Sequence, residues 1–228
     1  MIEILYLAKG RPEFTKASCA ALHGNTDGRK AIVHTFSCYD SPIEAMAAFI
    51  PGTSEVFAKI DNDVIVPPGW LETCLAVMEA NPRLELLGIE PPLSRNASPR
   101  PRPIDPAETS PGPLGYCPCE AIGGIGLMRR SAFESRPPMV PHSVYGGFTD
   151  WQLKHKPVCG WIAPPLKVFL LDRLPIEPWA SLSKSYIAQG QQRFWQNYKP
   201  EDHELWDWWL NTTVDKCSDS ATLARNGA

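Results

Sequence analysis

Apolar runs of strand length alternate with helical stretches over residues 2–89, and this alternation limits the folds open to the chain. The predicted strands span residues 2–8, 31–36, 56–60 and 84–89. The helices predicted between them span residues 14–22, 41–49 and 70–80. Such alternation favours an α/β fold, a parallel sheet with helices on its faces. Ligands in such sheets bind at the carboxyl ends of the strands.

Polar clusters stand at three of these strand ends. They are Lys9-Gly10-Arg11, residues 37–40, and Asp61-Asn62-Asp63. The carboxyl ends of parallel strands share one edge of the sheet, so the three clusters are expected to converge there. The turn at Gly10 is not a GxGxxG fingerprint, and no GxxxxGK[ST] loop occurs in the sequence. Dinucleotide-binding dehydrogenases and P-loop enzymes are therefore disfavoured.

The acidic triplet is the sharpest chemical signal. Asp61 and Asp63 stand one residue apart at a strand end, where their charges repel and a nearby cation would relieve the repulsion. Mg²⁺ and Mn²⁺ prefer carboxylate oxygens and keep substrate phosphates as further ligands. The functional interpretation is a metal–diphosphate platform. The alternative is an ordinary acidic turn, because Asp and Asn both suit turns.

Composition sets the broad class. The chain has 228 residues, 43% of them hydrophobic and 21% charged, which fits one large globular domain. A formal net charge of -3 gives no overall attraction to nucleic acid or to an anionic membrane. No apolar run approaches the roughly 18 residues needed to span a bilayer, and the amino terminus lacks a signal-peptide pattern. The expectation is a soluble cytoplasmic protein.

The seven cysteines are odd in number and scattered, which fits reduced thiols in a cytosol. Cys117-Pro-Cys119 has no second cysteine pair or spaced histidine pair, so a zinc site is disfavoured.

The second half of the chain is less regular. Residues 90–119 form a long loop rich in Pro, Arg and Ser, and residues 121–128 form a predicted strand with three glycines. A second loop spans residues 135–148, and Thr149 is the predicted N-cap of the helix that follows. Gly160-Trp161 is predicted to begin a turn, and a further strand, residues 167–171, ends at Asp172. Two helices, residues 181–198 and 200–211, are expected to pack their tryptophans onto the sheet.

Four segments, in this order, resemble the GT-A fold glycosyltransferases, in particular the family 2-like group. Gly10-Arg11-Pro12-Glu13 resembles the nucleotide-binding start, and residues 60–71 resemble the DxD segment with its following helix. Residues 122–127 resemble the glycine-rich strand on the acceptor side. Residues 147–153 resemble the segment where the family usually has Glu-Asp before a helix.

The resemblance implies a mostly parallel Rossmann-like sheet flanked by helices and followed by a helical tail. One domain would span residues 1–213, with a nucleotide-binding half over 1–90 and an acceptor-side, catalytic half over 120–175. The helical tail would span residues 180–213, and residues 214–228 would form a flexible end.

The resemblance also implies a metal-dependent, inverting transfer of a hexose or pentose from a nucleoside-diphosphate sugar, with a UDP-sugar favoured, to an acceptor hydroxyl. Asp150 would be the general base. Mn²⁺ or Mg²⁺ would be held by Asp61 and Asp63, with Asp172 as a third ligand. These two DxD acids would also contact the nucleotide sugar, together with residues Lys9, Arg11 and Asp40. The acceptor would be bordered by residues Gly123, Gly124 and Trp151.

The sequence departs from the family pattern in two places. Thr149 stands where an acidic residue is common, so Asp150 has a second interpretation as an acid favoured by the helix dipole. Residues 37–40 replace the family's frequent Asp-Asx-Gly-Ser pattern.

Two other functions stay open. One is a nucleotidyltransferase on a related fold, although the Gly-rich, Arg/Lys-containing opening loop of such enzymes is missing. The other is a non-catalytic module that binds a sugar or a partner. The expected acceptor is a glycan precursor, and a lipid-linked one would require peripheral membrane association. A modified DNA base is the alternative in a phage-type relative, but the net charge does not indicate a nucleic acid.

Overall fold

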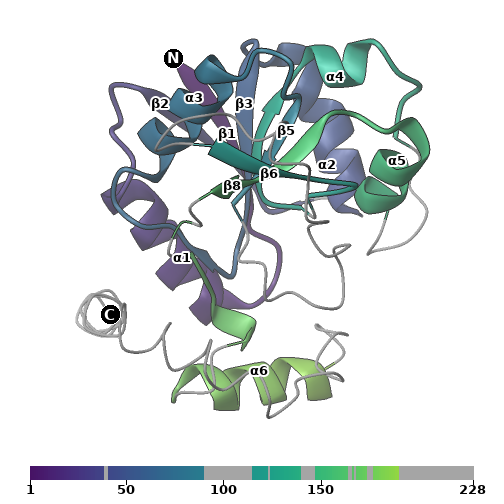
Figure 1. The fold of residues 1–228 in the computed structure, drawn as a ribbon. Coiled ribbons are helices and arrows are strands. Elements are labelled where there is room, and N and C mark those ends of the chain that lie inside the picture. Colours follow the sequence, from purple (N-terminus) through teal and green to yellow (C-terminus); the bar gives the residue numbers. More distant parts are fainter. Residues whose placement is uncertain are drawn as a thin grey trace.

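The structure is a computed structural model, and it describes residues 1–38, 41–89, 115–122, 124–139, 147–163, 166, 168–173 and 177–189. Its centre is a seven-stranded sheet in the order β2-β1-β3-β7-β5-β8-β6 (Figure 1). A small two-stranded sheet pairs β4 with β9. The predicted α/β fold class is therefore confirmed.

The strands of the large sheet are β1 (Ile2–Leu7), β2 (Ala31–Phe36), β3 (Val56–Asp61), β5 (Leu86–Gly88), β6 (Gly115–Cys119), β7 (Gly126–Arg129) and β8 (Cys159–Ala163). The small sheet consists of β4 (Val64–Ile65) and β9 (Phe169–Leu170). The helices are α1 (Pro12–Gly24), α2 (Pro42–Phe49), α3 (Trp70–Ala80), α4 (Ser131–Glu134), α5 (Gly147–His155) and α6 (Trp179–Ala188). Two short 3₁₀ turns cover Ile50–Gly52 and Leu171–Arg173.

Five of the seven strands of the large sheet, namely β2, β1, β3, β5 and β8, run in the same direction. β1 pairs in parallel with both β2 and β3, and β5 pairs in parallel with β8. β7 lies between β3 and β5 and is antiparallel to both of them. At the far edge β6 is antiparallel to β8. The sheet is therefore mostly parallel, with one reversed strand, β7, at its centre and another, β6, at its edge.

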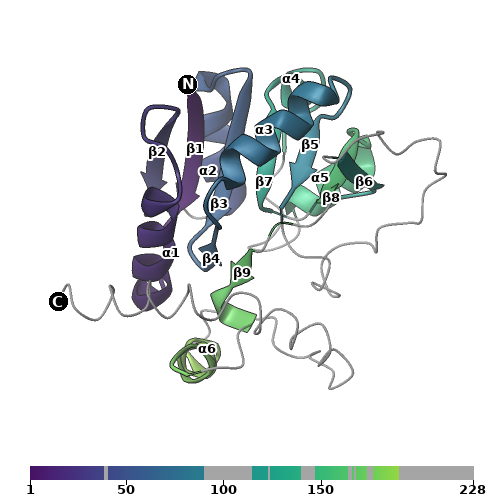
Figure 2. The ribbon, with the colours of Figure 1, turned by 60° about the vertical axis from the view of Figure 1, so that its left-hand side comes forward.

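The hydrophobic core lies on both faces of this sheet. Alternate residues of β1 divide between them, because Ile4 and Tyr6 join one cluster whereas Leu5 and Leu7 join the other. The first cluster contains buried side chains of α3 and the second contains those of α2, α4 and α5. Figure 2 shows the sheet between these helical layers. Both faces are covered, as the apolar strands predict.

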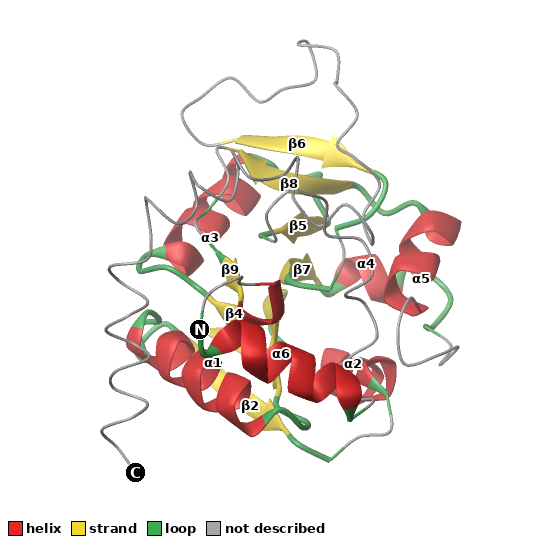
Figure 3. Cartoon of the chain, turned by 90° about the horizontal axis from the view of Figure 1, so that it is seen from below, coloured by secondary structure: helices red, strands yellow, loops and turns green. Residues whose placement is uncertain are grey.

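The last described helix, α6, lies beyond the carboxyl ends of the strands and beside α1 (Figures 2 and 3). Trp179 and Tyr186 of α6 pack their rings against Phe14 of α1, at centroid distances of 5.9 and 5.2 Å. The Tyr186 hydroxyl also donates a hydrogen bond to Glu13. α6 therefore packs its aromatic side chains on α1. The tryptophans predicted to pack on the sheet lie outside the described residues.

Several boundaries differ from those predicted. The glycine-rich strand starts only at Gly126, and α5 starts at Gly147, two residues before the predicted N-cap Thr149. β6 falls within a stretch predicted as loop, and β8 includes Gly160, where a turn was predicted. The predicted helix at 181–198 is α6 in its described part, and the regions 200–211 and 214–228 lie outside the described residues. None of the described helices has the length and apolar character needed to cross a membrane.

Candidate functional site

The acidic turn, residues 61–63, follows β3 directly, and both sides of it are fixed by hydrogen bonds. Ser18 of α1 is fully buried, and its hydroxyl donates to the Val64 carbonyl at 2.6 Å. On the other side, the Leu171 amide donates to the Asp63 carbonyl at 2.7 Å. α1 and the segment after β9 therefore hold the turn in place at the carboxyl end of the sheet.

Asn62 connects the acidic turn with the turn after β1. Its side chain is only 3% exposed. The Nδ2 group donates to the carbonyls of Lys9 at 3.2 Å and Gly10 at 3.0 Å, and to the Thr15 hydroxyl at 2.9 Å. The turn it reaches needs a glycine, since Gly10 has a φ of 70°. Two of the clusters predicted at strand ends, residues 9–11 and 61–63, therefore meet through Asn62.

Arg11 is the cation next to Asp63. Its Nη1 group lies 2.9 Å from Asp63 Oδ2, and its Nη2 group donates to Asn62 Oδ1. Arg11 itself has a left-handed backbone (φ 49°), and its guanidinium stacks over the Phe14 ring at 5.6 Å. Burial lowers the pKa of Arg11, but the carboxylates of Asp63 and Asp172 outweigh burial and raise it. Arg11 therefore stays charged beside the acidic turn.

Lys59 is the cation next to Asp61. It precedes Asp61 by two residues on β3, so both side chains leave the sheet on the same face. The Lys59 Nζ atom lies 2.5 Å from Asp61 Oδ1 and 2.7 Å from the Gly124 carbonyl oxygen. The repulsion expected between Asp61 and Asp63 is therefore relieved within the chain by Lys59 and Arg11.

Asp172 reaches the same region through the small sheet. Val64 pairs with Leu170, and this pairing brings the chain after β9 next to the acidic turn. Asp172 lies two residues after the end of β9, in the short 3₁₀ turn, and is close enough to Arg11 to raise the pKa of Arg11. Of the predicted metal ligands, Asp61 and Asp63 therefore stand in one turn. Asp172 belongs to the segment beside that turn and lies near Arg11.

The donor atoms fit a hard divalent cation in part. Asp61 Oδ1 and Asp63 Oδ2 face protein cations, so Asp61 Oδ2 and Asp63 Oδ1 are the oxygens that could bind a metal. Among the residues that the structure describes, no group of three or more His, Cys, Asp or Glu side chains is arranged around one metal position. Mg²⁺ typically takes one or two carboxylates and completes its shell with phosphates and water, so a site with two carboxylates would fit an ion that arrives with a diphosphate.

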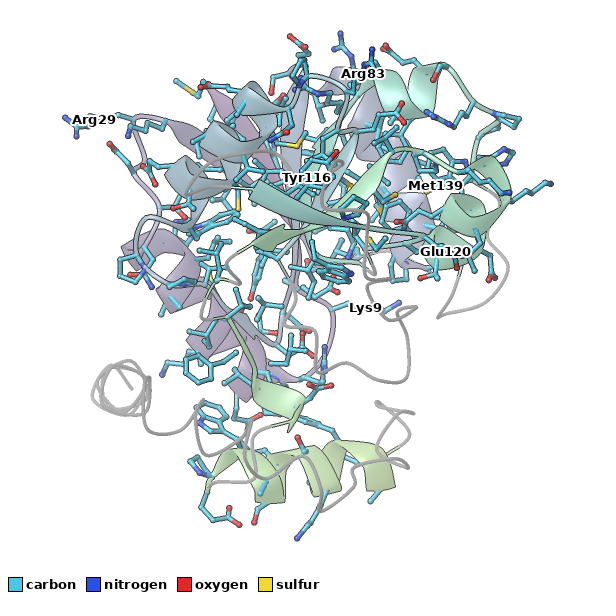
Figure 4. The ribbon with its side chains drawn as sticks, in the orientation of Figure 1. Lys9, Arg29, Arg83, Tyr116, Glu120 and Met139 are labelled. Carbon is cyan, nitrogen blue, oxygen red and sulfur yellow. The ribbon has the colours of Figure 1, made fainter. Side chains whose placement is uncertain are left out.

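The other predicted site residues are placed differently. Lys9 is exposed and lies beyond the end of the sheet, on the side of α6 (Figure 4). Asp150 is exposed on the first turn of α5. Trp151 is 5% exposed, stacks on Phe133 at 5.0 Å and donates its Nε1 proton to the Pro137 carbonyl, so its ring belongs to the core. The predicted residues Asp40 and Gly123 lie outside the described part of the chain.

Two residues of the site were not predicted from the sequence. The local sequence indicates only a turn former at Asn62 and a strand residue at Lys59. A lysine inside a run of buried strand residues is itself a signal, because buried lysines need a partner. The identity of that partner depends on which strand lies beside β3, and local sequence does not specify this.

No family model matches the chain, and no curated protein matches it in sequence. Three solved structures illustrate its likeness in fold. The structure of S. aureus TarS 1-349 is 7% identical, has a TM-score of 0.53 and aligns with 92% of this chain and 78% of its own. The structure of S. aureus TarS 1-349 in complex with UDP-GlcNAc has a TM-score of 0.50 at 7% identity, and the alignment covers 72% of this chain and 56% of that chain.

Full S. aureus TarS gives a TM-score of 0.52 at 8% identity over 99% of this chain, which spans about half (52%) of that longer protein. At such identities the likeness shows the fold alone. The order of the strands and the TarS likeness together confirm that this chain has the GT-A fold predicted from its sequence.

Proposed function

We propose that the chain is a metal-dependent, inverting glycosyltransferase that moves a sugar from a nucleoside-diphosphate sugar to an acceptor hydroxyl. The observation that carries this proposal is the acidic turn. Two carboxylates, Asp61 and Asp63, stand at the carboxyl end of β3 with Arg11 beside them. In open α/β sheets this is the edge where ligands bind. A neighbour in fold, S. aureus TarS, was solved with UDP-GlcNAc, which supports a nucleotide sugar as donor.

The residues around the turn suit a diphosphate. Asp61 and Asp63 would hold Mn²⁺ or Mg²⁺, and the ion would neutralise charge on the leaving nucleoside diphosphate. Arg11 presents a planar guanidinium, which matches phosphate geometry, and Lys9 is exposed on the same turn. Asp172 would be a further carboxylate near the ion, through its place next to Arg11.

Asp150 is the proposed general base. It lies exposed on the first turn of α5, and α5 packs on the face of the sheet that contains Phe57. Lys59 and Asp61 lie on this same face, because they follow Phe57 at every second residue of β3. A carboxylate there would take the proton of the acceptor hydroxyl as that oxygen attacks the anomeric carbon. Attack from the side opposite the leaving group inverts the configuration. Gly124, which lies against Lys59 and Asp61, would border the acceptor.

Donor hydrolysis tests this function. The purified chain is incubated with UDP-, GDP- and dTDP-sugars and Mn²⁺, and the released nucleoside diphosphate is measured. We expect slow release from one donor, loss of nucleotide binding and release in Asp63→Ala, and retained binding with at least about tenfold slower release in Asp150→Asn. Asp27→Ala is the matched control, because Asp27 pairs with Arg29 away from the site.

The results that would refute the function are equally definite. If calorimetry with Mn²⁺ detects no binding of any of these nucleotides, the chain is not a glycosyltransferase of this kind. If a nucleotide sugar binds through Asp63 but Asp150→Asn releases the diphosphate as fast as the wild type, Asp150 is not the base.

A further inference from the structure

Lys59 is a charged residue in the interior of the sheet. It is only 4% exposed, and it stands in the middle of β3 between two residues that are fully buried. Lysine is almost never buried unless its charge is paired. An apolar residue of similar volume is often as stable in such a place as a buried ion pair. A role in stability alone therefore does not explain a lysine here.

The geometry around Lys59 joins two parts of the site. β3 and β7 pair so that Lys59 is opposite Gly126, and continuing this register sets Gly124 opposite Asp61. The Lys59 ammonium fills the space between them, 2.5 Å from Asp61 Oδ1 and 2.7 Å from the Gly124 carbonyl oxygen. A Cβ atom on Gly124 would lie only 3.2 Å from Nζ and 3.5 Å from Asp61 Oδ2. The backbone at Gly124 thus lies directly against the ion pair.

A second contact fixes the same segment to α5. Gln152 is fully buried, and its Oε1 atom accepts a hydrogen bond from the Ile122 amide at 2.8 Å. Its Nε2 group donates to the Phe148 carbonyl within α5 at 3.3 Å. The helix that carries Asp150 is therefore connected to Ile122, and Lys59 connects Gly124 to Asp61.

We propose that Lys59 is a positioning residue of the donor site. It fixes Asp61 against the backbone at Gly124, so that only Asp61 Oδ2 faces an incoming ion, and it keeps the acidic turn at a constant distance from the segment that contacts α5. This inference rests on the proposed function, because it gives Lys59 a part in that reaction.

The proposal predicts opposite changes in two measurements. In Lys59→Met the positive charge beside Asp61 disappears, so free Mn²⁺ should bind about tenfold tighter in calorimetry without nucleotide. Donor turnover should nevertheless fall about tenfold or more, with nucleotide affinity changed by less than about threefold, because Asp61 and Gly124 lose their fixed separation. Lys59→Arg should restore most of the turnover and the weaker Mn²⁺ binding, since it keeps the charge and the donors.

Lys30→Met is the matched control. Lys30 also pairs with a carboxylate, Glu72, at 3.0 Å, but its side chain is 52% exposed and lies outside the site. Neither Mn²⁺ affinity nor turnover should change in this variant. Gly124→Ala is the second test, used if Lys59→Met does not fold. Its added methyl group should displace the Lys59 ammonium and lower turnover about threefold or more while the lysine remains.

Several outcomes would overturn the proposal. A folded Lys59→Met that binds Mn²⁺ and turns over donor like the wild type would make Lys59 a core residue without a part in the site. Weaker Mn²⁺ binding in Lys59→Met would contradict the charge argument, and unchanged turnover in Gly124→Ala would contradict the positioning argument. If the wild type turns over no donor, the proposed function fails, but the Mn²⁺ measurement still decides whether Lys59 neutralises Asp61.

Discussion

Replacing Asn62 by aspartate changes almost nothing in shape, yet the structure predicts a clear loss of stability. The Asn62 Nδ2 group donates to three oxygens: two carbonyls, of Lys9 and Gly10, and the hydroxyl of Thr15. In Asn62→Asp an oxygen takes the place of Nδ2. A carbonyl cannot donate to that oxygen, and the Thr15 hydroxyl already donates to the Gly10 carbonyl at 2.9 Å, so the hydrogen bonds made by the two Nδ2 protons are lost.

The magnitude follows from these contacts. Two lost hydrogen bonds cost about 2 kcal/mol, and a buried carboxylate oxygen facing two carbonyls adds about 1 kcal/mol. The contact of Arg11 with the other oxygen of residue 62 becomes an ion pair and recovers about 1 kcal/mol. The net loss is about 2 kcal/mol, which lowers the melting temperature of a chain of this size by about 4–8 °C.

Thermal unfolding followed by circular dichroism measures this shift. Asn81→Asp is the matched control, since the Asn81 side chain donates one hydrogen bond, to the Val77 carbonyl at 2.8 Å. It should cost about 1 kcal/mol, half of the loss at residue 62. If Asn62→Asp melts at the wild-type temperature or above it, the Asn62 amide does not donate to the turn after β1, and the connection between the two turns is wrong.

Two further substitutions test the fold. Gly126→Ala should be strongly destabilising, by about 3 kcal/mol or more, because its Cβ atom would lie 2.0 Å from the Leu87 carbonyl oxygen, whereas Gly52→Ala, with no atom within 4 Å, should melt near the wild type. Comparable melting temperatures of the two variants would refute the close packing of β7 on β5. Burial would raise the pKa of Glu85, but its double contact with Arg136 at 2.7 and 2.8 Å outweighs burial and lowers it. The stability from this pair is therefore present above the unfolded pKa of glutamate and is lost as pH falls through the lower folded pKa. Glu85→Gln should cost about 1–2 kcal/mol at pH 7, and its melting temperature should converge with that of the wild type as the pH falls through the lowered pKa of Glu85. A constant difference between the two curves over this range would contradict the assignment.

The first half of the fold could be predicted from the sequence because its signals are local. The apolar runs of β1, β2 and β3 have strand length, and Ser41 forms with Glu44 the capping box that starts α2. The strands of the second half depend on partners far along the chain. β8 contains Gly160, which reads locally as a turn. Its glycine is explained only by the Tyr116 ring of β6, which lies where a Cβ atom would stand.

The candidate site shows the same division. The acidic residues Asp61 and Asp63 could be predicted from their place at a strand end. Their partners could not, because Arg11 is 52 residues from Asp63 and the Lys59 ammonium also needs the Gly124 carbonyl, 65 residues away. From the sequence, a metal ion was the predicted partner that neutralises the two acids. In the structure, each acid pairs with a cationic side chain of the same chain. Local patterns identify which residues carry charge, but the tertiary fold decides which of those charges meet.

The reversed direction of β7 has a consequence for how chains of this fold can diverge. The residues that follow a parallel strand lie at the edge of the sheet where ligands bind, so new binding residues arise downstream of such a strand. β7 runs the other way between β3 and β5, and so the residues that precede it, such as Gly124, arrive at that edge. Insertions upstream of β7 would remodel the site, whereas insertions after Arg129 would lengthen a loop on the opposite side of the molecule. Variation in specificity among similar chains is therefore expected upstream of this strand.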